Sequence, residues 1–248
     1  MKIIGWFILF LSANANAQNA VIKELRFKPN TKFYNTTANT IVYPVVITKN
    51  ATINKLINDK IRKEVLGSEN ADLNISKQIA NEINDGLTDL TYEIRFRKNG
   101  ILSLNTSRQE CVGNCNNSNT RLNFDLTTGM QIFITDLLSE NKIDSFRNIV
   151  FRQKIKLLEK YKQEEKQNIT NKQIDDETYK WILSEVDSGC IKTVSITDFS
   201  LSAGYIEIID PCEFPHAIRS QEPDYKLKYS YKNVFDFMKP AWLRRLSK

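Results

Sequence analysis

The chain has 248 residues, of which 41% are hydrophobic and 26% are charged, and this composition excludes a wholly disordered or a membrane-embedded protein. A single histidine, His216, excludes multi-histidine metal sites and argues against most Ser-His and Cys-His mechanisms, while 8 glycines that never cluster exclude a Rossmann fingerprint and a P-loop. The formal net charge of +6 comes from scattered basic residues, which argues against nucleic-acid binding and favours anionic envelope polymers or an acidic partner.

Residues 1–17 are predicted to form a secretory signal peptide. One positive charge precedes a short apolar run, and the small residues end in Ala15-Asn16-Ala17, so we expect cleavage before Gln18. The apolar run is shorter than the roughly 20 residues that a bilayer span requires. We therefore expect an exported protein, periplasmic or secreted, with no membrane span after cleavage and a polar lead-in over residues 18–39.

The N-terminal half of the domain is expected over residues 40–130, and it begins with a strand and two helices. The β-branched run 41–47 contains Pro44, which predicts an edge strand. Apolar residues at helical spacing then predict a helix capped by Asn50 or Thr52 that ends at Gly67, and a second helix that ends at Gly86. The two apolar stripes are Ile53, Leu56, Ile57, Ile61 and Val65, then Ile75, Ile79 and Ile83.

Two hairpins are predicted after these helices. From Tyr92 the apolar residues recur with a period of two, and Asn99-Gly100 accepts the positive φ angles of a tight hairpin turn. A second hairpin is expected from residues 122–126, through a turn at Gly129, to residues 130–134. The polar segment 107–120 between the hairpins is predicted to be a loop.

The C-terminal half is expected over residues 131–248. Apolar spacing predicts a long helix over residues 143–166, with a solvated charged face at 159–166. A shorter helix, capped by Asp175 or Asp176, is expected to end at Gly189. A hairpin that turns at Gly204 and a last strand complete the domain. The tyrosines of this last strand are expected in the core, with stacking on sugar rings as the alternative; they are Tyr225, Tyr229 and Tyr231.

The four cysteines are expected to form disulfides, because an exported chain meets an oxidising compartment. A zinc site with four thiolates needs two short spacings, and only Cys111 and Cys115 are close in sequence. Of the three possible pairings, we favour Cys111 with Cys115 and Cys190 with Cys212. The turn near residue 203 lies 13 residues after Cys190 and 9 before Cys212, so the flanks of that hairpin would bring the second pair together.

The order of these segments resembles a known domain family. The Asn99-Gly100 hairpin, the stretch from Leu122 to Gly129, and the sequence Ile134-Thr135-Asp136-Leu137-Leu138 before a long helix are similar to the envelope domain of lysozyme-sensing anti-sigma factors and of the accessory, non-catalytic module of some peptidoglycan deacetylases. The resemblance covers roughly residues 40–240. It implies an α+β fold in which helices pack on one face of an antiparallel sheet built from hairpins.

The resemblance also implies recognition, with two departures from the family. In the anti-sigma factors the domain is a receptor that docks onto lysozyme, and in the deacetylases it lies beside the catalytic domain. The family's loop after the hairpin is rich in glycine and contains a histidine, whereas this chain has Cys111-Val112-Gly113-Asn114-Cys115. A cytoplasmic sigma-binding segment and a transmembrane helix are also missing from the sequence, which argues against an anti-sigma role.

Carboxylates are the acid-base groups left for an enzyme. Asp125 and Asp136, or Asp210 and Glu213, could act as acid and base if the fold set them roughly 5–9 Å apart, the range that glycoside hydrolysis uses. Asp125 precedes a turn and Asp136 precedes a helix, so capping explains both residues. We therefore expect no catalytic residue.

Two further features have alternative interpretations. His216 is expected to be a hydrogen-bonded structural residue, with ligand contact as the alternative. Trp242, with Arg244 and Arg245, either caps the sheet or touches a partner.

Together these features predict a recognition domain of the cell envelope that has no catalytic activity, cofactor or metal. It would bind a protein such as a muramidase (lysozyme) or a cell-wall glycan through residues 110–119, because a short disulfide would reduce the ordering cost of binding. The alternatives are a carboxylate enzyme acting on envelope polysaccharide and a structural or assembly factor. The expected contact residues are Glu110, Val112, Gly113, Asn114, Asn116 and His216.

Overall fold

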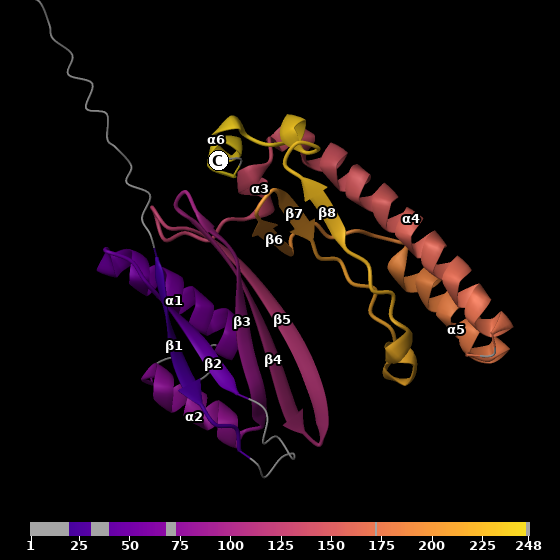
Figure 1. The fold of residues 1–248 in the computed structure, drawn as a ribbon, viewed down its shortest axis with the longest axis horizontal. Helices are drawn as coiled ribbons and strands as arrows, with labels where there is room; N and C mark the ends of the chain where they lie inside the picture. The colour runs from indigo at the N-terminus through magenta and orange to yellow at the C-terminus, as the bar shows by residue number, and fades with distance from the viewer. Residues whose placement is uncertain (1–19, 31–39, 68–72, 172, 247–248) are drawn as a thin grey trace, which may run out of the picture.

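The computed structural model describes residues 20–30, 40–67, 73–171 and 173–246, and the predicted signal peptide lies outside them. These residues form an α+β fold with a five-stranded sheet and a three-stranded sheet (Figure 1). The predicted fold class is confirmed. The larger sheet has the order β1-β2-β3-β4-β5, and all of its neighbours are antiparallel except β2 and β3.

The prediction that residues 41–47 form an edge strand is wrong. This strand, β2 (Ile41–Ile47), lies between β1 (Val21–Phe27) and β3 (Leu87–Lys98). The outer strand β1 lies in the predicted polar lead-in over residues 18–39, where charged residues obscure the alternating apolar pattern of a strand. Pairing between β2 and β3 is confined to one position, Ile41 with Leu90, so a proline farther along β2 interrupts no ladder on that side.

The two helices predicted after β2 are confirmed, and they cover one face of the five-stranded sheet (Figure 1). Helix α1 (Ala51–Leu66) begins at Asn50, whose side-chain Oδ1 accepts hydrogen bonds from Thr52 N at 2.9 Å and Ile53 N at 3.2 Å. Helix α2 (Ile75–Asn84) follows. The buried faces of both helices are formed mainly by the predicted isoleucines: Ile53, Ile57, Ile61, Ile79 and Ile83.

The first predicted hairpin is confirmed, and the loop predicted after it is wrong. Positive φ angles at Asn99 and Gly100 turn β3 into β4 (Ile101–Val112). The segment 107–120 continues as strand, because β4 turns at Gly113 straight into β5 (Asn114–Asp125). Its polar residues are typical of a loop, but hydrogen bonding to the neighbouring strand supports them in a long two-stranded extension.

The second predicted hairpin forms only in part. The chain turns at Gly129 as expected, but the returning segment makes a single bridge, Gln131 to Phe124. It then enters the short helix α3 (Ile134–Leu137). Ile132 precedes this helix, Ile134 and Leu137 belong to it, and all three side chains are buried in the C-terminal cluster.

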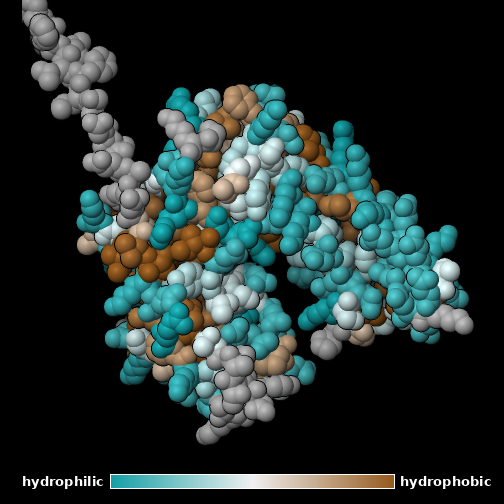
Figure 2. Space-filling model, viewed as in Figure 1, coloured by the Kyte–Doolittle hydropathy of each residue, from teal (hydrophilic) through white to brown (hydrophobic). Residues whose placement is uncertain are grey.

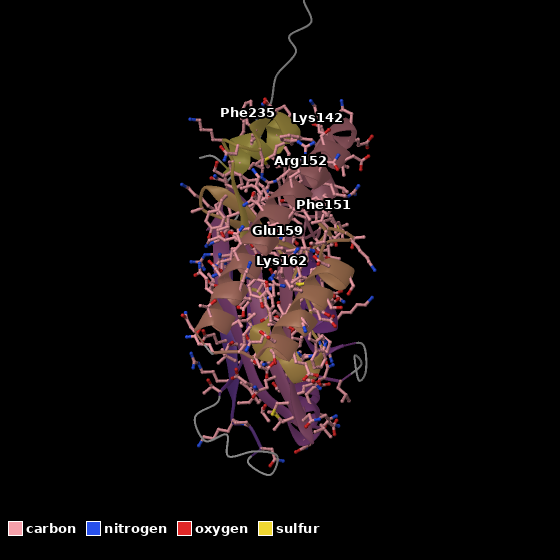
Figure 3. The ribbon with its side chains drawn as sticks, turned by 90° about the vertical axis from the view of Figure 1, so that its right-hand side faces the viewer. Lys142, Phe151, Arg152, Glu159, Lys162 and Phe235 are labelled. Atoms are coloured by element: carbon pink, nitrogen blue, oxygen red, sulfur yellow. A yellow bond between two sulfur atoms is a disulfide. The ribbon has the colours of Figure 1, made fainter. Side chains whose placement is uncertain are left out.

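The C-terminal half combines two helices with the smaller sheet. Helix α4 (Ile143–Thr170) is longer than predicted, and α5 (Asp176–Glu185) begins at Asp175, whose Oδ1 accepts a hydrogen bond from Thr178 N. Figure 3 looks onto the outer side of α4, where Lys162 and Glu159 form an ion pair at 2.8 Å. The three-stranded sheet consists of β6 (Phe199–Ser202), β7 (Tyr205–Ile208) and β8 (Leu227–Ser230), and the chain continues into α6 (Pro240–Leu246).

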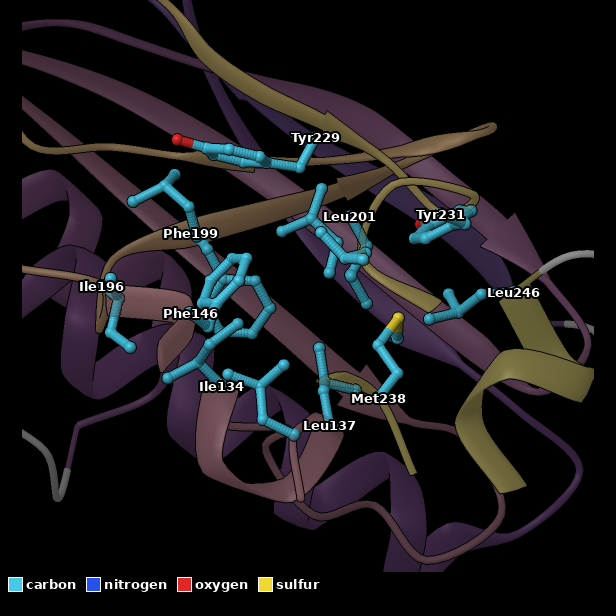
Figure 4. Packing of buried hydrophobic residues seen from close by; sticks show 14 of the residues in the cluster. Ile134, Leu137, Phe146, Ile196, Phe199, Leu201, Tyr229, Tyr231, Met238 and Leu246 are labelled. Atoms are coloured by element: carbon cyan, nitrogen blue, oxygen red, sulfur yellow. The ribbon is translucent and has the colours of Figure 1, made fainter. Parts of the chain in front are cut away.

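The two faces of the five-stranded sheet belong to different hydrophobic clusters. Leu102 and Leu104 pack beneath α1 and α2, whereas Phe96 and Ile101 join the C-terminal cluster, part of which Figure 4 shows. That cluster contains Phe146 of α4, and it buries Tyr229 and Tyr231 to 5% exposure, so these two tyrosines are core residues as predicted. The end of the large sheet that carries Phe96 and Ile101 is therefore buried on both faces.

Candidate functional site

The far end of the β4–β5 hairpin is clamped by a disulfide. Cys111 lies directly opposite Cys115, Val112 lies opposite Asn114, and Gly113 makes the turn with φ +83°. The disulfide joins Cα atoms only 4.1 Å apart, the close separation of a pair without mutual backbone hydrogen bonds. The second disulfide joins Cys190 to Cys212, so the structure has the pairing that the sequence favoured.

The clamped end exposes several of the predicted contact residues. Val112 is 69% exposed, and Gly113, Asn114 and Asn116 are exposed beside it. Cys111 is buried instead, at 1%. The disulfide therefore lies inward and supports a tip that presents one apolar side chain among amides.

Hydrogen bonds tie the base of this tip to the rest of the sheet and to both helices. Cys111 N donates to Gly86 O at 2.8 Å, just beyond the end of α2. Arg108 donates to Val65 O at the end of α1 and to Glu82 of α2, each at 2.5 Å. Arg108 also pairs with Glu110, so this predicted contact residue is held by an ion pair.

His216 is not part of the β4–β5 hairpin. It begins the 3₁₀ helix His216–Gln221, far along the chain in the C-terminal half. Its side chain lies outside the described part of the structure.

Asp125 and Asp136 both line a shallow pocket of about 480 Å³ with Met130, Phe133 and Trp242. Met130 is 62% exposed and Phe133 is 53% exposed, so the pocket is an open apolar depression. The two aspartates therefore line one pocket, but each carboxylate is already engaged by its own polar contacts.

Asp125 is held by Arg245. The guanidinium donates to its carboxylate at 2.7 and 3.0 Å, and it also donates to Gly100 O at 2.8 Å in the β3–β4 turn. Burial raises the pKa of Asp125, but the hydrogen bonds from Arg245 and Thr127 outweigh burial and hold this pKa below its ordinary value. Arg245 also lies over the Trp242 ring at 4.6 Å, so this pair caps the end of the sheet.

The other carboxylates considered from the sequence are also explained by structure. Asp136 Oδ2 accepts a hydrogen bond from Phe133 N at 2.8 Å, which is a helix cap. Asp210 accepts from Lys154 at 2.6 Å and from Ser195 N at 3.1 Å, while Glu213 is exposed. Three of the four carboxylates considered as acid-base groups therefore have structural roles. Asp125 is a turn residue bound by Arg245, Asp136 is a helix cap, and Asp210 forms an ion pair with the buried Lys154.

A polar pocket of about 330 Å³ lies between the two sheets, next to the hairpin. Its walls include Arg95, Asn105 and Arg121 of the large sheet and Glu207 of β7. Arg95 pairs with Glu207 at 3.0 Å, and Arg121 pairs with Asp198 at 2.7 Å. These residues carry no local signal in the sequence, because their partners lie between 77 and 112 positions away along the chain.

In the described residues no group of three or more His, Cys, Asp or Glu side chains is placed to hold a metal ion. Within the described residues, no helix is both long enough and apolar enough to cross a bilayer.

Comparison with known proteins adds information on the fold. No family model matches the sequence, and no curated protein matches it. A DUF3298 family member from Bacteroides fragilis has a similar solved structure, with a TM-score of 0.56 at 9% identity over 93% of this chain and 97% of the other. A DUF3298 family protein from Pseudomonas aeruginosa gives a TM-score of 0.51 at 12% identity over 90% and 95%. The chain is therefore similar in fold to DUF3298 proteins, a domain of unknown function.

Proposed function

We propose that this protein is an exported, non-enzymatic recognition domain of the bacterial cell envelope. It binds an envelope protein such as a muramidase, or a cell-wall glycan, through the clamped end of the β4–β5 hairpin. The observation that carries this proposal is the disulfide between Cys111 and Cys115 beneath an exposed tip. A surface that is ordered before binding loses less conformational entropy when it meets a partner.

Export is supported by the two disulfides, which are consistent with an oxidising compartment outside the cytoplasm. The lack of enzymatic activity is proposed because Asp125, Asp136 and Asp210 are each occupied by a structural partner. Recognition needs none of these groups to be free.

Binding is tested by retention of the oxidised chain on immobilised lysozyme and on insoluble peptidoglycan. We expect retention on one of them, and we expect the double substitution Val112→Asp with Asn116→Asp to reduce it at least about tenfold. Lys160→Asp, on the exposed side of α4 at 72% exposure, is the matched control and should bind normally. Absence of retention on both materials would count against the proposal.

An enzyme acting on envelope polysaccharide is the second candidate, favoured only by the joint presence of Asp125 and Asp136 at one pocket. Its test is the release of soluble fragments from peptidoglycan by the purified chain. Turnover that disappears in both Asp125→Asn and Asp136→Asn, with the fold intact, would replace recognition by catalysis.

A further inference from the structure

Within the described residues, the outer backbone edge of β5 has no partner strand from the hairpin tip to Arg121. In an antiparallel ladder, the N–H and C=O groups of successive residues point alternately to one neighbour and the other. Cys111 N donates to Gly86 O on the β3 side, so the Cys111–Cys115 pair makes no mutual bonds and Cys115 points its backbone groups away from β4. The same alternation directs Asn117, Asn119 and Arg121 outward.

The other end of β5 confirms this direction. Asn123, which continues the same series, accepts a hydrogen bond from Ile132 N at 2.7 Å on the side away from β4. In the described chain no hydrogen bond reaches the outward backbone groups of Cys115, Asn117, Asn119 or Arg121. Four consecutive outward positions are therefore available for a new strand.

Over residues 114–120 this edge carries none of the usual protection against strand pairing, and the charged side chain of Arg121 next to them pairs with Asp198. Edge strands are normally guarded by lysine, proline or a bulge. Residues 114–120 contain no charged side chain and no proline, and their register with β4 is continuous. The disulfide holds this register at the tip.

The surroundings favour a single extended chain as the occupant. Figure 2 shows an open notch between the part of the molecule that carries β5 and the C-terminal part, and the pocket lined by Arg121 and Asp224 lies where the two parts meet. One strand requires only about 4.8 Å beside its neighbour. A second copy would have to bring a whole folded domain into the notch, and it would carry the same net charge of +6.

We infer that β5 binds an uncharged extended segment of a neutral or acidic partner protein, which adds to the five-stranded sheet as a further strand next to Cys115, Asn117, Asn119 and Arg121. This inference rests on the proposed recognition function and specifies its partner. Main-chain hydrogen bonds would supply the affinity, and the side chains of Asn117 and Asn119 would contact every second residue of the segment.

Amide hydrogen exchange, followed residue by residue by NMR, tests the geometry in the free protein. We expect slow exchange at Asn116, Ser118 and Thr120, whose amides point to β4, and fast exchange at Asn117 and Asn119. Equal protection of both sets would show that the edge is already covered, which would overturn the inference.

Binding is tested with a display library of random dodecapeptides, panned on the oxidised full chain. We expect a captured peptide to slow exchange at Asn117 and Asn119. N-methylation of its backbone at alternate positions should abolish binding. In the protein, Asn119→Pro should weaken binding at least about tenfold because it removes one outward N–H group, whereas Asn119→Ala keeps that group and should bind normally.

Each other outcome contradicts the inference. Capture of no peptide, or equal binding by Asn119→Pro with an unchanged unfolding midpoint, would place recognition elsewhere. A dimer of the free chain that Asn119→Pro dissociates would identify a second copy as the occupant. Retention on lysozyme or peptidoglycan that persists in Asn119→Pro would leave the proposed function standing while removing the strand-pairing site.

Discussion

At the scale of single residues, polar side-chain contacts join segments that are distant in sequence. Arg245 reaches Asp125 and the β3–β4 turn, and Lys154 reaches Asp210. The first contact connects the C-terminal half to the N-terminal half, whereas the second connects α4 to the segment that follows β7. A substitution that removes one partner leaves the other in a partly dehydrated position.

Asp125→Asn is expected to lower the free energy of unfolding by about 1.5–3 kcal/mol at neutral pH, because charge-assisted hydrogen bonds from Arg245 are lost. The folded-state pKa of Asp125 lies below its ordinary value, so its contribution is complete above the unfolded pKa of about 3.9 and disappears as pH falls through the lowered value. Urea denaturation should therefore show a difference between the two proteins at pH 7 that shrinks as the pH falls below about 3.9. Asp144→Asn, at 88% exposure, is the control and should change stability by less than about 0.5 kcal/mol.

Lys154 is the most deeply buried cation of the described residues, at 3% exposure, and it pairs with Asp210 at 2.6 Å. Lys154→Met should cost about 3–5 kcal/mol, because it leaves the Asp210 carboxylate without its partner in a site that is 12% exposed. The double variant Lys154→Met with Asp210→Leu should recover part of that loss. A double-mutant cycle in urea measures the coupling, and additive losses would show that the pair is not coupled.

At the scale of elements, the end of β4 next to the turn is packed tightly against Gly86, whereas the turn residue Gly113 has open space around it. A Cβ atom added at Gly86 would lie 2.6 Å from Val112 Cγ2 and 3.1 Å from Cys111 O, whereas one added at Gly113 meets nothing within 4 Å. Both glycines have positive φ angles, +113° and +83°. The two positions therefore share backbone strain and differ in available space.

Gly86→Ala and Gly113→Ala form a matched pair for this arrangement. Gly113→Ala should cost about 1–2 kcal/mol from backbone strain alone. Gly86→Ala should cost about 1 kcal/mol more, and it should also weaken partner binding, since Val112 would have to move. Thermal unfolding and the retention assay check the two effects, and equal stability losses would show that the contact between Gly86 and the hairpin is unimportant.

The elements also show why some sequence predictions succeeded. The caps at Asn50 and Asp175 and the turn at Asn99-Gly100 are local, so the residues that make them are neighbours in sequence. The loop predicted over residues 107–120 was wrong because polar strands are supported by a neighbouring strand, which local composition does not reveal.

At the scale of the whole molecule, the large sheet connects two hydrophobic clusters. Adjacent residues of β4 point to opposite faces, so Ile101 belongs to the C-terminal cluster and Leu102 to the cluster beneath α1 and α2. A substitution that destabilises one cluster is therefore expected to destabilise the other, because the two clusters share strand β4. Unfolding should be cooperative.

Leu104→Ala and Phe146→Ala test this cooperativity from opposite sides of the sheet. Each removes a side chain with 0% exposure and should cost about 3–5 kcal/mol. Both should shift one common thermal transition, seen at the same temperature by far-ultraviolet circular dichroism and by the fluorescence of Trp181 and Trp242 in the C-terminal half. Two separate transitions would show that the halves unfold independently.

The sequence by itself determined the helices, their caps and the first hairpin turn, because each depends on local periodicity or on turn chemistry. The favoured cysteine pairing is also present, but Cys190 lies in the helical turn Val186–Cys190 and not on a flank of the hairpin, so the reason given for it was wrong. Only the tertiary structure decided that β1 pairs with β2, that Arg245 and Lys154 engage the candidate carboxylates, and that no described strand pairs with the outer edge of β5. These features join residues from distant parts of the chain. Such contacts arise when hydrophobic surfaces are buried together, and no short window of sequence contains both partners.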